Sequence, residues 1–399
     1  MHFFRKRSRP RVAVLTATAA VVAPLCLTAI AQAAPADDSG NLLALTRQYL
    51  QDRASRVTDS RPAALAASAL TSVAATSPFS ARLATEIPAL DRLRARTVGT
   101  YAQYRNAQVD LVSPTVTVTG DTARVTVQEQ TRLVFAKRDT PDSADATRYQ
   151  VPHVLDFQRH GAGWVLASDA LDVPADALDP VPYVNPVKLQ PATRRDLASE
   201  TPIPKDVKPN YPGAQPYSSA PPVSINGGVP IDRQTAVRYA RTFALSYNPA
   251  YERFGNDCTN FASQVMRAGG WPDVGRPGPD GDDKWFQYNV VSHSRTWAIA
   301  HEFFFFGYLH SKRLRHYAGE TPLIADLIFV DWAWGGVPDA HLDHTMIITE
   351  NPAGNINDWS KIKVTYHSTD QDNVPLNVVS DKLGQGANWY FTDTRGLPG

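Results

Sequence analysis

A proline-rich stretch divides this chain into two parts. Residues 173–230 contain 13 prolines in 58 residues, with Ser, Asn and Gly between them and no sustained apolar period. Because proline interrupts both helices and central strands, the stretch predicts an extended linker that can lie across a neighbouring domain. Two folded regions are therefore expected, at residues 34–172 and 231–399, and a continuous helical bundle is excluded.

The composition fits folded domains with packed cores. The 399 residues are 43% hydrophobic and 20% charged, which is too apolar for a disordered chain. Forty Lys and Arg oppose 39 Asp and Glu, leaving a formal charge of +1. This balance gives no global sign of a nucleic-acid partner or of a membrane-surface partner.

The first 33 residues have the pattern of a secretory signal peptide. A basic head at residues 5–11 precedes an apolar stretch at residues 12–30, and Ala31-Gln32-Ala33 is a small-x-small cleavage pattern. We expect cleavage after Ala33 and a secreted, extracellular protein. No later segment approaches eighteen apolar residues, so no stable membrane span is expected after cleavage.

The first folded region should be a small α+β domain. Apolar residues follow helical spacing from Asn41 to about Tyr104, and then alternate on both sides of Gly120-Asp121, which predicts a hairpin. Residues 149–157 and 164–167 read as two further strands. This order of elements resembles the cone-shaped SnoaL-like fold, whose members have many functions, so the resemblance assigns none.

The second region contains the one cysteine that would remain after signal cleavage. Removing the signal removes Cys26 and leaves Cys258, which cannot form an internal disulfide. Asp232 is a plausible N-cap for the helix that opens this region. Phe261 and Val265, four residues apart before Gly269-Gly270, place Cys258 in the first turn of a second helix.

The position of Cys258 predicts an activated thiol. Backbone N–H groups and the helix dipole at a helix N-terminus stabilise a thiolate and lower the thiol pKa. The carboxylate of Asp257 acts in the opposite direction unless it caps the helix or meets a cation. The sequence therefore indicates a reactive cysteine that needs a base from elsewhere in the chain.

Two histidines flank a predicted hairpin in the last part of the chain. His344 opens a short apolar strand and His367 ends a second one, with a polar turn at residues 351–358 between them. Such a hairpin would bring the two histidines near one another. A cysteine on a helix followed by a sheet that carries histidine is the layout of papain-like hydrolases.

Three ordered segments carry a resemblance to a known family. They are Asn256-Asp257-Cys258-Thr259-Asn260-Phe261-Ala262-Ser263-Gln264, His344-Thr345-Met346-Ile347 and Tyr366-His367-Ser368. Together they resemble the putative amidase domain family of secreted bacterial proteins, and more distantly the NlpC-type and CHAP-type cell-wall hydrolases. The similarity covers roughly residues 232–398. It implies a papain-like α+β fold in which the helix bearing the cysteine packs on an antiparallel sheet.

The resemblance also implies roles for three residues. Cys258 would be the nucleophile, His344 the base, and His367 the residue that orients His344. The implied function is a cysteine amidase or peptidase that hydrolyses an amide bond, in cell-wall peptides, with no cofactor and no metal. The sequence gives no indication of the oligomeric state or of the scissile bond.

Other interpretations remain open at this point. Cys258 can be an inert buried residue, and a carbonyl can satisfy His344. Asp370 or Asp372 can orient the base as well as His367 can. The whole domain can also be a non-catalytic wall-binding or interaction protein that retains the hydrolase fold.

A zinc site is a further alternative, but its geometry is unfavourable. Asp339, His341, Asp343 and His344 are ligand types for zinc. Alternation along a strand, however, would send His341 and His344 to opposite faces. The cysteine would then have no role.

Overall fold

The fold is described by a computed structural model. It covers residues 36–62, 71–173, 201–210, 229–277, 281–290, 292–317, 321–332, 337–352, 357–382 and 386–395. The predicted signal peptide lies outside the described residues, as does most of the proline-rich linker. None of the helices in these ranges is long and apolar enough to cross a membrane.

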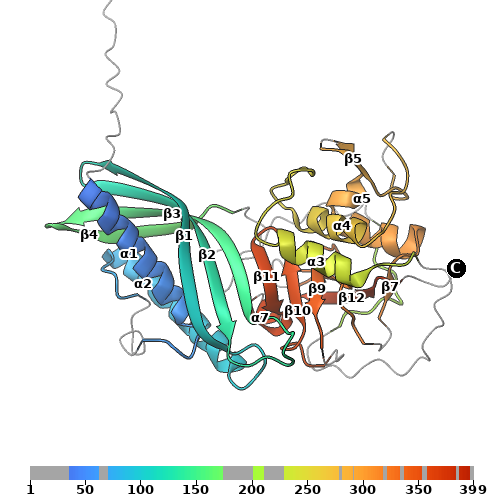
Figure 1. The fold of residues 1–399 in the computed structure, drawn as a ribbon, viewed down its shortest axis with the longest axis horizontal. Coiled ribbons are helices and arrows are strands. Elements are labelled where there is room, and N and C mark those ends of the chain that lie inside the picture. The colour runs from blue at the N-terminus through green and yellow to red at the C-terminus, as the bar shows by residue number, and fades with distance from the viewer. Residues whose placement is uncertain are drawn as a thin grey trace, which may run out of the picture.

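The N-terminal half consists of two helices against four long strands, as the sequence predicts. The elements are α1 (Ala36–Ser55), α2 (Ser77–Thr97), β1 (Tyr104–Thr119), β2 (Thr122–Phe135), β3 (Ala146–His160) and β4 (Gly163–Leu171). The predicted hairpin at Gly120-Asp121 is confirmed, because β1 and β2 pair with Thr119 opposite Thr122. Gly120 has φ 59°, a conformation in the left-handed region that favours glycine. Figure 1 shows both helices lying along one side of the curved strands.

The C-terminal half places helices over a second group of strands. Its helical elements are α3 (Arg233–Phe243), α4 (Cys258–Ala268), α5 (Arg295–Ala298), α6 (Ala300–Phe305), the π-helix η4 (Phe306–His310) and α7 (Leu376–Lys382). Its strands are β5 (Gln287–Asn289), β6 (Ser292–His293), β7 (Arg315–His316), β8 (Leu327–Asp331), β9 (His344–Glu350), β10 (Lys363–Tyr366), β11 (Asp370–Pro375) and β12 (Asn388–Asp393). The predicted N-cap is confirmed, since the Asp232 carboxylate accepts a hydrogen bond from the backbone N–H of Thr235 at 3.0 Å.

One antiparallel sheet joins the two halves. Within the described ranges it has ten strands, in the order β1-β2-β3-β11-β10-β9-β8-β12-β7, with β4 also paired to β3. The junction is the pairing of β3 with β11, where Arg148 lies opposite Asp372. The strands of both predicted regions therefore belong to a single sheet within an α+β fold. Figure 1 shows β11 of this sheet beside the strands of the N-terminal half.

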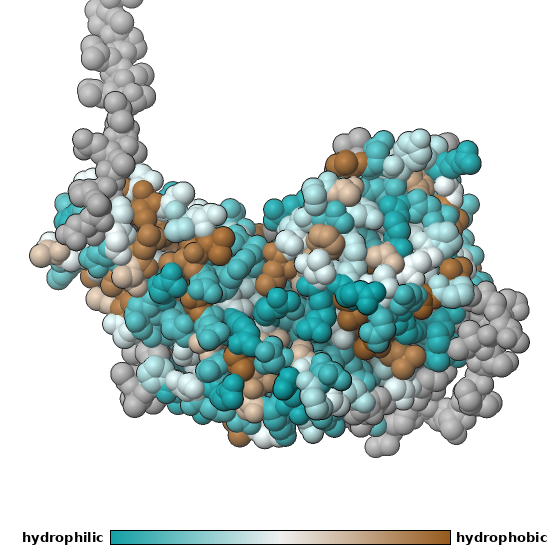
Figure 2. Space-filling view, viewed as in Figure 1, coloured by the Kyte–Doolittle hydropathy of each residue, from teal (hydrophilic) through white to brown (hydrophobic). Residues whose placement is uncertain are grey.

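Two apolar cores lie against this sheet. The first contains residues of both halves, including Leu50 from α1, Tyr149 from β3 and Ile348 from β9. The second lies under α3, α4 and α6 and includes Phe261. Figure 2 shows that the surface on this side is hollowed between the two halves.

The described part of the predicted linker, residues 201–210, lies against the C-terminal half. Val207 is buried in the second core. The backbone N–H of Asn210 donates to Trp389 O at 2.6 Å, and its side-chain oxygen accepts from Phe391 N at 3.2 Å. The end of this segment therefore contacts β12 through Asn210.

Candidate functional site

Cys258 is the first residue of α4, where the sequence predicts it. Phe261 and Val265 lie fully buried on the helix face that packs into the second core. The helix ends at Gly269, where a Cβ atom would come within 2.7 Å of Ile231 Cγ1. Glycine at this position therefore allows the close approach of the chain that leads into α3.

The thiol of Cys258 faces the beginning of β9. Its Sγ lies 3.6 Å from Thr259 Oγ1, and the backbone of Thr345 also hydrogen-bonds the sulfur. The hydroxyls of Thr259 and Thr345 lie 3.2 Å apart, which fixes the start of α4 against the start of β9. Cys258 is buried, with an exposed fraction of 3%.

The expectation of a lowered thiol pKa is wrong for this state of the protein. Burial raises the pKa of Cys258 to about 11, and the hydrogen bonds from Thr259 and Thr345 only partly oppose it. The charge of Asp257 raises the pKa further. The helix N-terminus does not compensate for removing a thiolate from water, so the resting thiol is protonated at neutral pH.

Asp257 contacts His367. Its Oδ2 lies 2.9 Å from His367 Nδ1, and both side chains are buried. The second ring nitrogen, Nε2, lies 2.9 Å from the carbonyl oxygen of Phe243. Both ring nitrogens of His367 therefore have partners other than His344.

His367 therefore does not orient His344 in this structure. Its two ring nitrogens bond Asp257 and Phe243, and the ring stacks on Phe261 with centroids 3.8 Å apart. These contacts hold the end of β10 against α4. The orienting role expected for His367 stays a prediction that the contacts in this structure do not support.

Asp370, another candidate for orienting the base, is hydrogen-bonded to Tyr247. Its Oδ1 accepts a hydrogen bond from the Tyr247 hydroxyl at 2.9 Å. Burial raises the pKa of Asp370, although the nearby His367 opposes the shift. Asp372 faces the N-terminal half, where it pairs with Arg148.

His344 opens β9, as predicted, in an apolar aromatic setting. Its ring lies 5.6 Å from Trp332 and 5.0 Å from Tyr366, measured between centroids. Burial lowers the pKa of His344 to about 3, so the ring is neutral. Its Nε2 is buried and makes no hydrogen bond within the part of the chain that the structure describes.

The predicted hairpin is confirmed, and it brings the two histidines to the same end of the sheet. β9 and β10 pair antiparallel, with Thr365 opposite Ile347. Alternation then gives His344 and Thr345 opposite faces, and Thr345 is the residue that contacts α4. Among the described residues no hydrogen bond joins Cys258 Sγ to a histidine.

Acidic residues stabilise the loop before β9 by accepting hydrogen bonds from backbone N–H groups. Asp331 accepts hydrogen bonds from Asp339 N and Ala340 N, and the Asp343 carboxylate accepts from Trp332 N. His341 stacks on His301 with centroids 4.8 Å apart. Across the described ranges no group of three or more His, Cys, Asp or Glu residues could hold a metal ion.

Sequence reasoning missed several residues at the site. The Ser368 hydroxyl accepts from Asp257 N at 2.8 Å and donates to Asn256 Oδ1 at 2.7 Å. Phe243, at the end of α3, and Tyr247, in the loop after it, also contact the site. Ser368 and Thr345 directly follow the two predicted histidines, which is the only signal the sequence offered for them.

The C-terminal half is an α+β domain in which a helix that begins with a cysteine packs on an antiparallel sheet. Two histidines lie at one end of that sheet. Residues 230–390 match a family model described as "Putative amidase domain". The C-terminal region of this chain therefore contains a domain of that family, as the three sequence segments predict.

Two curated proteins of Bacillus subtilis (strain 168) are similar to this chain. Uncharacterized protein YhbB is 34% identical over 130 residues, which is 31% of this chain and 39% of YhbB. Uncharacterized protein YjcM is 30% identical over 168 residues, which is 40% of this chain and 36% of YjcM. The matches thus span well under half the length of these relatives.

One solved structure was found with a partial match. It is the crystal structure of Kfla4162 protein from Kribbella flavida, at 15% sequence identity and a TM-score of 0.22. The match covers 34% of this chain and 89% of that chain.

Proposed function

We propose that this protein is an exported cysteine amidase or peptidase with a papain-like C-terminal domain that hydrolyses an amide bond in cell-wall peptides. Cys258 is the nucleophile and His344 is the base. The observation that supports the proposal best is the position of Cys258, at the first residue of α4 and against the backbone of Thr345. The family match over residues 230–390 supports the reaction class.

The proposed reaction is acyl transfer through a thioester. His344 takes the thiol proton, Sγ bonds the amide carbonyl carbon, and the C–N bond breaks as His344 returns the proton to the leaving amine. Water then hydrolyses the thioester, which releases the carboxylate and restores the thiol. The backbone N–H of Cys258 lies in the first turn of α4, where helix N–H groups lack intrahelical partners and can bind the oxyanion.

His344 is neutral in the free protein, as a proton acceptor has to be, but with a pKa of about 3 it becomes an effective base only when substrate binding changes its surroundings. A neutral imidazole has one nitrogen that can accept a proton, and His344 Nε2 has no hydrogen-bond partner in the described residues. His344 directly precedes Thr345, whose backbone contacts the sulfur. Alternation along β9 gives His344 the face opposite Thr345, so this proposal requires the start of β9 to rearrange when substrate binds, before the imidazole can reach the thiol.

The second candidate is a non-catalytic wall-binding protein that retains this fold. The raised pKa of the Cys258 thiol favours it, because a binding protein has no need of a thiolate. In such a protein Cys258 would be a structural residue between α4 and β9.

The decisive experiment compares Cys258→Ser and Cys258→Ala with the wild type on purified peptidoglycan peptides. Mass spectrometry follows the new amine and carboxylate ends, with and without a metal chelator. We expect loss of hydrolysis in both variants and no effect of the chelator on the wild type. Retained hydrolysis in Cys258→Ala would exclude the thiol mechanism.

Two histidine variants separate the roles of His344 and His367. If His344 is the base, His344→Gln lowers kcat by about two to four orders of magnitude, the range of a lost general base. His367→Gln should change kcat less and mainly lower stability, because it removes a buried hydrogen-bond partner of the Asp257 carboxylate. A silent His344→Gln would remove His344 from the mechanism. Binding of the wild type to cell walls without any hydrolysis would favour the second candidate.

A further inference from the structure

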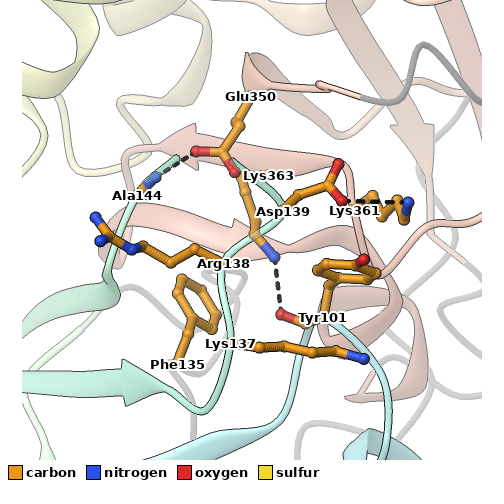
Figure 3. A pocket seen from close by; sticks show the side chains of 9 residues that line it. All are labelled: Tyr101, Phe135, Lys137, Arg138, Asp139, Ala144, Glu350, Lys361 and Lys363. Atoms are coloured by element: carbon orange, nitrogen blue, oxygen red, sulfur yellow. Dashed lines mark hydrogen bonds and ion pairs between the residues drawn. The ribbon is translucent and has the colours of Figure 1, made fainter. Parts of the chain in front are cut away.

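Two adjoining hollows lie where the N-terminal half meets the β9–β10 hairpin. One, shown in Figure 3, is a narrow space between the end of β2, the loop that follows it and the two hairpin strands. The other is a surface hollow of about 340 Å³ between β1, β2 and the same loop. Phe135, Lys137 and Arg138 line both, so the two hollows adjoin, and we refer to the pair as the groove. The narrow hollow, at about 10 Å³, has room for no more than one water molecule.

The groove is rich in cations. It is lined by six cationic and three acidic residues, namely Arg105, Arg132, Lys137, Arg138, Lys361 and Lys363 against Asp139, Asp145 and Glu350. Two of the acids are already paired, since Asp139 lies 3.4 Å from Lys361 Nζ and Asp145 bonds Arg132. Glu350 accepts a hydrogen bond from Ala144 N at 2.6 Å.

The other four cations have no carboxylate within ion-pair distance in the described part of the chain. Arg105 and Lys137 are exposed, and the Arg138 guanidinium bonds only the carbonyl of Pro141. The Lys137 ammonium donates to Gly99 O at 2.7 Å. The groove thus holds positive charge that the protein itself does not neutralise.

Lys363 is the most unusual of these cations because it is buried. Its exposed fraction is 3%, and its ammonium donates to two carbonyls, Tyr101 O at 3.1 Å and Ser360 O at 2.8 Å. Burial lowers the pKa of Lys363 to about 8, against the opposing charge of Glu350. A buried ammonium without a carboxylate partner costs folding free energy, which a bound anion would offset.

Aromatic rings fix the lysine side chains in place. The ammonium groups of Lys137 and Lys361 each lie 4.4 Å from the centre of the Tyr101 ring. The Lys363 ammonium lies 4.3 Å from the centre of the Phe135 ring. These contacts, drawn around Tyr101 and Phe135 in Figure 3, reduce the freedom that the lysines would lose on binding an anion.

We propose that this groove binds an anion that carries at least two phosphate groups. The wide hollow has room for more than one phosphate group, and its four cations can supply charge-assisted hydrogen bonds of the kind that phosphate oxygens accept. Lys361 and Lys363, which line only the narrow hollow, add positive charge behind them without touching the ligand. These two lysines come from the amidase half and the other four cations from the N-terminal half, so the ligand would bind beside the junction of the two halves.

The test uses inorganic tripolyphosphate as the probe and calorimetric titration of the full mature chain. The wild type is compared with the double variant Arg105→Gln/Lys137→Gln, which removes two exposed cations of the groove. The matched control is Arg92→Gln/Lys205→Gln, which removes the same two residue types at exposed positions outside the groove. Citrate is titrated in parallel as a multivalent carboxylate.

We expect tripolyphosphate to bind the wild type at low salt and to bind the groove variant about tenfold or more weakly, since the variant loses two charge-assisted hydrogen bonds to the anion. The control variant should change the affinity less than the groove variant does. Equal weakening in both double variants would overturn the proposal, because it would show an effect of net charge alone. Failure of the wild type to bind tripolyphosphate, or equally tight binding of citrate, would also overturn it. The result is independent of amide hydrolysis, which the groove variant should retain.

Discussion

The chemistry of Cys258 is controlled by two opposing effects. A helix N-terminus favours the thiolate, whereas the surroundings of Cys258 exclude the water that a thiolate needs. Burial is the larger effect here, and the charge of Asp257 adds to it. In the proposed reaction, substrate binding has to provide the stabilisation of the thiolate that the free protein lacks.

The first prediction concerns the reactivity of this thiol. At neutral pH iodoacetamide should alkylate Cys258 about 100-fold more slowly than the same residue in the unfolded chain. The reason is that raising the thiol pKa by about two units, to about 11, lowers the thiolate fraction about 100-fold. The rate should rise steadily up to about pH 11. Mass spectrometry of the Cys258 peptide, with and without urea, measures both rates. A native rate equal to the unfolded rate would show that the thiol is neither shielded nor shifted.

The second prediction concerns a buried network in the N-terminal half. His153 lies between two carboxylates, with Nδ1 2.7 Å from Asp169 and Nε2 2.9 Å from Glu129. Burial alone would lower the pKa of His153, but the carboxylates outweigh it and raise the value to about 9. The stabilisation is therefore complete below the unfolded value of about 6.5 and is lost as the pH rises through about 9.

His153→Gln tests this linkage directly. The wild type should exceed the variant in free energy of unfolding at pH 6, and its advantage should shrink by about 3 kcal/mol by pH 10. Urea titrations at four pH values between these limits measure the difference. An advantage that stays constant over this range would show that His153 does not carry the charge assigned to it.

Only part of the site could be predicted at the residue scale. Cys258 and His344 were identifiable because each opens an element whose apolar pattern is local. The partner of Asp257 was not, because His367 is 110 positions away and its choice between His344 and Asp257 depends on how β10 ends against α4. The sequence predicted that Asp257 caps the helix, meets a cation or acts on the thiol, but it did not identify His367 as its partner.

At the scale of elements, the periodic segments were predictable and the short ones were not. The hairpin of β1 and β2, the strands β3 and β4, and the pairing of β9 with β10 follow from alternation and turn residues. β7, two residues long, exists only because β12 pairs with it. Residues 201–210 likewise take their place from contacts with distant residues, such as Thr201 with His301 and Asn210 with Trp389 in β12, not from a local pattern.

The third prediction tests that contact through Asn210. Its side-chain oxygen accepts from Phe391 N, and Asn210 is buried. Asn210→Ala should lower the free energy of unfolding by about 1–3 kcal/mol, the cost of leaving a buried backbone donor without an acceptor. Asn210→Asp keeps an acceptor oxygen and should be closer to the wild type. Thermal unfolding of the three proteins checks the order, and equal losses in both variants would rule out the hydrogen bond as the cause.

At the scale of the whole molecule, the continuous sheet could not be foreseen. The proline-rich stretch separates the halves in sequence, yet β3 and β11, more than 200 positions apart, pair directly. Arg148 and Asp372 form the ion pair at this junction, and the Thr147 hydroxyl donates to Asn373 O at 3.0 Å. The first core then continues from α1 into β9 without interruption. Such a pairing depends on side chains from both halves and has no local signal.

The last prediction follows from this shared sheet. Because one core and one sheet include both halves, the protein should unfold in a single calorimetric transition, with equal calorimetric and van't Hoff enthalpies. Arg148→Asp puts a second carboxylate opposite the fully buried Asp372 in the β3–β11 pair. The repulsion between the two carboxylates should split the transition into two. Arg124→Asp makes the same change opposite Asp156 within the N-terminal half and should lower the midpoint while keeping one transition. Two transitions in the wild type would show that the halves unfold independently despite the shared sheet.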